Sequence, residues 1–76
     1  MGNNLLERIT SDPGVLCGKP VIKGTRISVE LILEKLVQGY SYQKITQEYD
    51  IQEEDIKAAL LFAQKTIANE EVYEAI

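Results

Sequence analysis

Residues 18–29 divide the chain into two parts, and they read Gly18-Lys19-Pro20-Val21-Ile22-Lys23-Gly24-Thr25-Arg26-Ile27-Ser28-Val29. The pairs Val21-Ile22 and Arg26-Ile27 flank a short turn, and this pattern predicts a β-hairpin in which Gly24 supplies a positive φ. Upstream, Ile9-Thr10 is a further candidate strand, and Asp12-Pro13-Gly14 has turn chemistry. Downstream, the sequence takes on the periodicity of amphipathic helices.

Three helices are predicted after this stretch. Ser28 is the expected N-cap of the first and Gly39 the residue that ends it, while Ser41 caps the second. The third begins with an acidic first turn at residues 53–55, expected to be solvated and to complement the helix dipole, and Asn69 is expected to end it. The expected core positions are Val29, Ile32, Leu33, Leu36 and Val37; then Tyr42, Ile45 and Tyr49; then Ile56, Ala59, Leu60, Ala63 and Ile67.

The proportions of the last two predicted helices and the turn between them are typical of a helix-turn-helix. We therefore expect a mainly α fold, a three- to four-helix, helix-turn-helix-like domain with a short N-terminal β-hairpin. The 76 residues form one domain, with a basic loop and hairpin segment (1–27), a helical core (28–68) and a short helix or tail (69–76). No apolar run could span a membrane and the N-terminus lacks signal-peptide character, so a cytoplasmic location without membrane contact is expected.

Charge is divided unevenly along the chain. Residues 1–27 carry four basic and two acidic side chains, net +2, whereas residues 28–76 carry four basic and ten acidic ones, net −6. An anionic partner should therefore meet the N-terminal segment. The candidate phosphate-binding residues are Lys19, Lys23, Thr25 and Arg26.

Arg26 illustrates the alternatives, since its guanidinium can bind a phosphate with two hydrogen bonds, pair with a carboxylate, or cap a helix. The acidic start of the third helix would repel phosphates, so this helix is not expected to enter a major groove in the usual way.

The residue types that metal sites and covalent catalysis need are scarce. The chain has no histidine and a single cysteine, Cys17, which excludes the common zinc sites and a Cys-His nucleophile. Cys17 is expected to be a buried or inert thiol. We expect no metal, no cofactor, no small-molecule substrate and no enzymatic activity.

The helices carry more apolar residues than a small monomer can cover. Six of these define the expected partner interface: Leu31, Leu61, Phe62, Val72, Tyr73 and Ile76. A homodimer is expected because a chain of this size is marginally stable alone and exposed apolar surface favours association. The alternative is that the tail folds back on its own core.

The string Gly18-Lys19-Pro20, Ile22 and Gly24-Thr25-Arg26-Ile27, followed by Gly39-Tyr40-Ser41, resembles the bacterial domain-of-unknown-function family 433. The resemblance covers roughly residues 9–65. It implies a helix-turn-helix-like, non-enzymatic protein of the VapB antitoxin type. Such a protein would neutralise a PIN-like toxin and repress its own promoter by binding DNA. The alternative function is a protein–protein interaction or dimerisation module that does not bind DNA.

Overall fold

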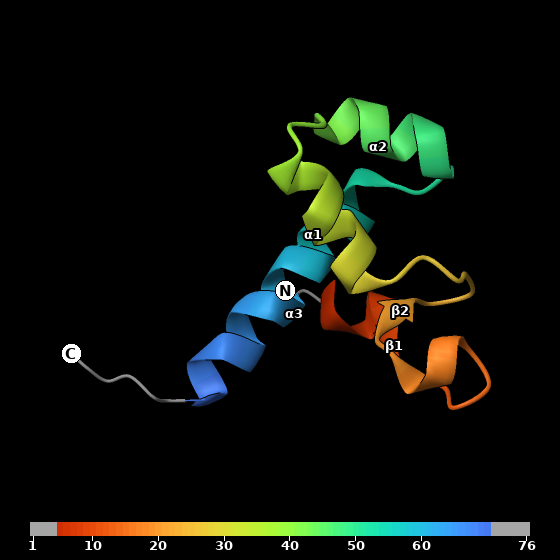
Figure 1. The fold of residues 1–76 in the computed structure, drawn as a ribbon, viewed down its shortest axis with the longest axis vertical. Coiled ribbons are helices and arrows are strands. Elements are labelled where there is room, and N and C mark those ends of the chain that lie inside the picture. The colour runs from red at the N-terminus through yellow and green to blue at the C-terminus, as the bar shows by residue number, and fades with distance from the viewer. Residues whose placement is uncertain (1–4, 71–76) are drawn as a thin grey trace.

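Three α-helices and one short antiparallel strand pair form most of residues 5–70, the part of the chain that this computed structural model describes (Figure 1). The elements in chain order are η1 (Leu5–Arg8), β1 (Ile9–Thr10), η2 (Leu16–Gly18), β2 (Val21–Ile22), α1 (Val29–Val37), α2 (Tyr42–Tyr49) and α3 (Glu53–Glu70), where η marks a 3₁₀ helix. The predicted mainly α fold with an N-terminal β-hairpin is confirmed. In residues 5–70 no helix combines the length and the apolar character needed to cross a membrane.

The strand partner differs from the one expected from the turn at residues 23–25. β2 pairs antiparallel with β1, with Ile9 opposite Ile22 and Thr10 opposite Val21. Residues 26–27 do not form a strand, although the Ile22 N–H donates to the Ile27 carbonyl at 2.9 Å. Ser28 forms an isolated antiparallel bridge with Val21, so the expected pairing is reduced to a single bridge at the point where α1 begins.

The helix boundaries follow the predicted caps. Ser28 Oγ accepts from the Leu31 N–H at 2.9 Å, and Ser41 Oγ accepts from the Lys44 N–H at 3.1 Å, which satisfies one free amide at the start of each helix. Asp50, with φ of 58°, ends α2 in the left-handed conformation. Asn69 does not end α3, because the helix continues to Glu70.

The core forms where β2 and the three helices meet. Its buried members are Ile22, Val29, Ile32, Ile45, Ile56 and Ala59. Three residues expected in the core are instead exposed: Val37 by 86%, Leu60 by 37% and Ile67 by 66%. Cys17, expected to be a buried or inert thiol, is exposed in η2.

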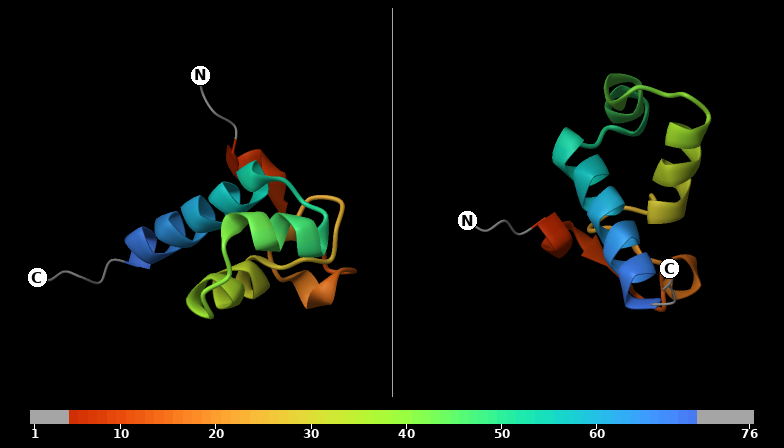
Figure 2. Two further views of the ribbon diagram at one scale, coloured as in Figure 1. Left: turned by 90° about the horizontal axis from the view of Figure 1, so that it is seen from above. Right: turned by 90° about the vertical axis from the view of Figure 1, so that its left-hand side faces the viewer.

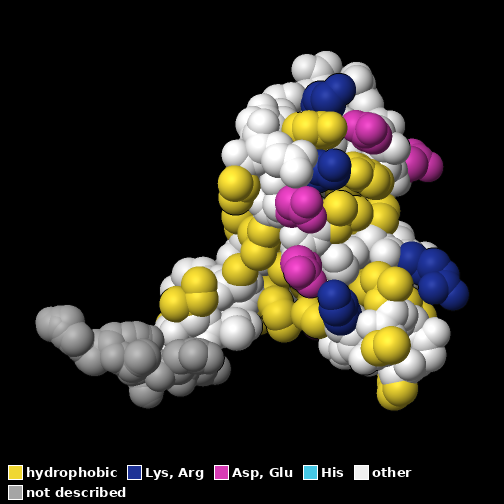
Figure 3. All heavy atoms as spheres, viewed as in Figure 1, with side chains coloured by type: hydrophobic (Ala, Val, Ile, Leu, Met, Phe, Trp, Pro, Cys, Tyr) yellow, Lys and Arg dark blue, Asp and Glu magenta, His cyan; other side chains and the backbone are white. Residues whose placement is uncertain are grey.

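The exposure of Ile67 follows from the length of α3. α3 has 18 residues and α1 only nine, so the C-terminal half of α3 extends beyond the body of the domain (Figure 2). Hydrophobic side chains are visible on this projecting part (Figure 3). Helical periodicity predicts which face of a helix is apolar but not how far along the helix its neighbours reach.

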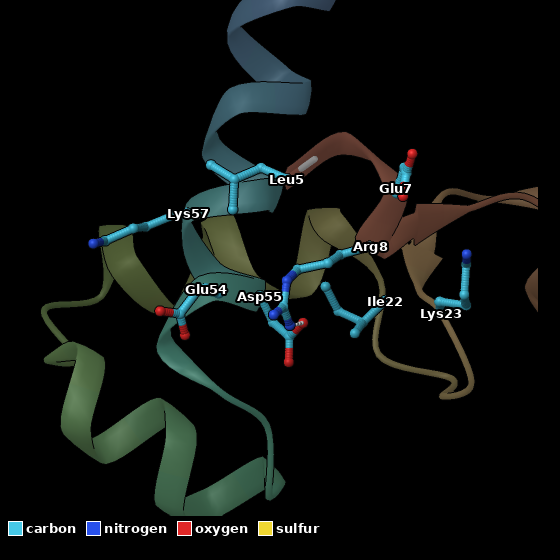
Figure 4. A pocket seen from close by; sticks show the side chains of 8 residues that line it. All are labelled: Leu5, Glu7, Arg8, Ile22, Lys23, Glu54, Asp55 and Lys57. Carbon is cyan, nitrogen blue, oxygen red and sulfur yellow. Dashed lines mark hydrogen bonds and ion pairs between the residues drawn. The ribbon is translucent and has the colours of Figure 1, made fainter. Parts of the chain in front are cut away.

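An ion pair joins the N-terminal segment to the start of α3. Arg8 Nη1 of η1 lies 2.9 Å from Asp55 Oδ1, and the other carboxylate oxygen accepts from the Gln52 N–H at 2.9 Å (Figure 4). Asp55 is only 7% exposed, so the expectation of a solvated carboxylate was wrong at this position. It caps its own helix from the third position and binds Arg8 at the same time.

We predict that Asp55→Ala lowers the free energy of unfolding by about 2–3 kcal/mol. The change removes a cap worth about 1 kcal/mol and leaves Arg8 without its carboxylate partner, with only a hydrogen bond of 3.4 Å to Gln52 Oε1. The cost stays below the roughly 3–5 kcal/mol of a fully buried pair because Arg8 is partly exposed. Urea denaturation measures the effect. Glu54→Ala is the matched control, since Glu54 is exposed on the same turn, and equal losses from both substitutions would contradict the role of Asp55.

Candidate functional site

The predicted phosphate-binding stretch contains a tightly bonded turn. The Ile22 carbonyl accepts both the Thr25 N–H at 2.9 Å and the Thr25 hydroxyl at 2.8 Å. Thr25 Oγ1 in turn accepts from the Ile27 N–H at 2.9 Å. Gly24 has φ of +81° at the position where a type II turn requires a positive value.

Thr25 therefore has a structural role in this turn. Its hydroxyl proton is donated to Ile22 and its oxygen accepts from Ile27, so both functions of the hydroxyl hold the turn together. A further hydrogen bond connects the turn to η1: the Lys23 N–H donates to the Arg8 carbonyl at 2.8 Å. The turn therefore presents its side chains from a fixed backbone.

Lys23 and Arg26 are the exposed cations of this turn. They line one shallow depression of about 700 Å³ together with Thr10, Asp12, Val15, Val21, Gly24 and Thr25. Within residues 5–70, neither cation has a carboxylate within ion-pair distance. Asp12 also lines the depression, and one of its oxygens accepts from the Gly14 N–H at 2.9 Å.

Lys19 lies apart from this pair. Its Nζ is 3.1 Å from Glu30 Oε1 in α1, and both side chains are mostly exposed, so the pair adds little stability. It lines a different depression from Lys23 and Arg26. Of the four predicted phosphate-binding residues, the structure therefore brings together Lys23, Thr25 and Arg26 and separates Lys19.

An apolar groove runs between α1 and the C-terminal half of α3. It has a volume of about 370 Å³ and is lined mainly by hydrocarbon, with Leu33, Phe62 and Ile67 as its largest apolar residues. Phe62 also packs against the core, so it is less available than a fully exposed side chain. Lys19 and Glu30, which form an ion pair, also line this groove, so together they add no net charge to it.

The predicted partner interface overlaps this groove at one residue, Phe62. Leu31 and Leu61 are half-buried and do not line it. The remaining three residues, Val72, Tyr73 and Ile76, lie outside the described residues. Sequence reasoning missed Leu33 and Ile67 as groove residues, since both have the helical spacing of core positions.

The start of α3 is acidic and opens onto a third depression, drawn in Figure 4. Its volume is about 760 Å³, and its charged lining residues are Glu7, Arg8, Lys23, Glu54, Asp55 and Lys57. Glu53 pairs with Lys57 at 3.7 Å, and Glu54 is exposed. Among the described residues, no group of three or more His, Cys, Asp or Glu side chains is placed to hold a metal ion.

Comparison with known proteins places the chain in a family. An uncharacterized protein of Sinorhizobium fredii, y4eO, is 30% identical over 59 residues. These residues are 76% of this chain but only 27% of that protein, so the chain spans about a quarter of its relative's length. No solved structure matches significantly. The family described as "Protein of unknown function (DUF433)" matches residues 9–63, and the chain therefore belongs to it.

Proposed function

We propose that the chain is an antitoxin-like binding protein of the cytoplasm that neutralises a PIN-like toxin and represses its own promoter by binding DNA. The observation that carries this proposal is the presence of two chemically different surfaces on one small domain. One is the rigid turn that presents Lys23 and Arg26, which have no carboxylate partners within residues 5–70. The other is the apolar groove between α1 and α3.

DNA binding in this proposal depends on phosphate contacts. Arg26 can form a bidentate pair with a phosphate, and Lys23 adds a second positive charge on the same turn. We expect α3 to contribute little to the recognition of bases, because Glu53 and Glu54 would lie beside DNA phosphates and be repelled by them. Affinity should then depend strongly on salt and only weakly on sequence.

Toxin binding in this proposal uses the groove. Its hydrocarbon lining and neutral edge favour an apolar segment of the partner rather than a charged one. A second copy of the chain could use the same surface, which connects this proposal with the expected homodimer.

A protein-interaction module without a DNA role is the second candidate. It is favoured by the exposed carboxylates at the start of α3 and by the net charge of −4. The two candidates differ in one property, salt-dependent affinity for duplex DNA.

We predict that the double substitution Lys23→Ala and Arg26→Ala weakens binding to the DNA upstream of the gene. Each phosphate that is no longer neutralised should reduce the slope of log K against log salt by about 0.9. Fluorescence anisotropy across a salt series measures both quantities. Lys57→Ala with Lys65→Ala removes the same net charge from α3, and an equal effect in this control would show that only net charge matters.

We predict that Ile67→Lys weakens the complex with the toxin at least about tenfold. Ile67 is 66% exposed and lines the groove, so the new charge opposes an apolar contact without disturbing the core. Calorimetric titration with the purified product of the adjacent gene measures the affinity. Val37→Lys is the control, since Val37 is 86% exposed and lies away from the groove. Unchanged affinity in Ile67→Lys would assign the partner to another surface.

A further inference from the structure

The corner between α1 and α2 contains a second group of cations, to which no sequence pattern assigned a role. It is built around Gly39-Tyr40-Ser41. The Gly39 N–H donates to the Leu36 carbonyl and the Tyr40 N–H to the Lys35 carbonyl, each at 3.0 Å. These two bonds form a Schellman motif, with Gly39 at φ of +98°, and they set Tyr40 beside the last turn of α1.

The next residue begins the second helix at once. Ser41 Oγ accepts from the Lys44 N–H at 3.1 Å, and the Ser41 carbonyl accepts from the Ile45 N–H. Lys44 is thereby placed in the first turn of α2, close to the same tyrosine. Three consecutive residues thus end one helix, supply an aromatic ring and begin the next helix.

Two lysines converge on the Tyr40 ring. Lys35 Nζ and Lys44 Nζ each lie 5.1 Å from the ring centroid. Each distance is within the range for a cation–π contact. The two ammonium groups therefore cannot be further apart than twice that distance, and both lie beside one ring in an otherwise acidic helical region.

Carboxylates on the same helices form no ion pair with these two lysines within residues 5–70. Glu34 is hydrogen-bonded at 3.4 Å to Gln38, and Glu48, one turn along α2 from Lys44, forms no ion pair with it. Within residues 5–70 neither lysine has a carboxylate within ion-pair distance. These two cations are therefore available for contact with an external anionic group.

We propose that Lys35, Tyr40 and Lys44 form a phosphate-binding clamp that contacts the backbone of duplex DNA. This inference rests on the proposed function, and it names a contact point outside the turn at residues 22–27. Duplex DNA is favoured because its phosphates are closely spaced along the backbone, so two lysines held on one ring can each neutralise one. The half-buried Tyr40 ring limits the freedom of the lysine side chains, which lowers the entropic cost of binding.

The clamp also accounts for how an acidic chain could bind DNA. α3 presents carboxylates at its start, whereas the cations of the clamp belong to the corner between α1 and α2 and those of the Lys23–Arg26 turn to the segment that follows β2. Figure 1 shows where these two parts of the chain lie. Phosphate contacts from these two places would hold the duplex while α3 contributes little to affinity.

The test compares two double variants with equal net charge. Lys35→Gln with Lys44→Gln removes the clamp, and Lys57→Gln with Lys65→Gln removes two cations from α3. In anisotropy measurements with a promoter duplex across a salt series, only the clamp variant should show a smaller slope, by about 0.9 for each phosphate that it no longer neutralises. Circular dichroism of both variants verifies that the fold is retained.

Each outcome separates this inference from the proposed function. If the unmodified chain binds DNA and both double variants show the same drop in affinity and slope, the clamp is wrong and the proposed function stands. If the unmodified chain shows no salt-dependent DNA binding at all, the clamp and the DNA role fail together, while toxin binding through the groove is unaffected. Tyr40→Leu gives an independent check: it keeps both charges, so weaker binding with an unchanged slope is expected if the ring positions the lysines.

Discussion

Arg8 makes the polar contacts that fix the N-terminal segment to the helices, beside the apolar packing of Ile9 and Ile22 on the core. Its side chain binds the buried Asp55 at 2.9 Å, while its carbonyl accepts the Lys23 N–H at 2.8 Å. Arg8 therefore fixes the N-terminal segment to the first turn of α3 and fixes the Lys23–Arg26 turn to that same segment. The apolar contacts of Ile9 and Ile22 with the core also hold this pair of two-residue strands against the helices, and Arg8 adds polar contacts to them.

In both cationic surfaces, the Lys23–Arg26 turn and the α1–α2 corner, short-range hydrogen bonds fix the backbone that carries the long basic side chains. The turn at residues 22–27 is held by the Thr25 hydroxyl, and the α1–α2 corner is held by Gly39 and by the Ser41 cap. In both places the backbone is fixed before a partner arrives. A preformed surface loses less conformational entropy on binding, which is how a few exposed cations could support useful affinity.

Much of the fold could be predicted from the sequence because it is local. Ser28, Gly39 and Ser41 mark helix ends through bonds to residues three or four positions away, and α1 and α2 begin after those serines. The strand pairing could not be predicted in the same way, since Ile9 and Ile22 meet across 13 positions.

The missed site features are also long-range. Asp55 looks like an ordinary acidic residue at a helix start, and only the fold brings Arg8 to it from 47 positions away. Ile67 has core spacing on α3, yet it is exposed because α1 covers only part of that helix. The Lys35–Tyr40–Lys44 cluster could not be predicted because its lysines belong to two helices and meet only through the turn between them.

The most direct test of phosphate binding through these fixed corners is a titration of the ¹⁵N-labelled chain with its promoter duplex, followed by amide chemical shifts. We expect the largest changes at residues 23–26 and 39–44, with small changes at the start of α3. Changes concentrated at Glu53 and Glu54, or none anywhere at low salt, would contradict phosphate binding at these two places.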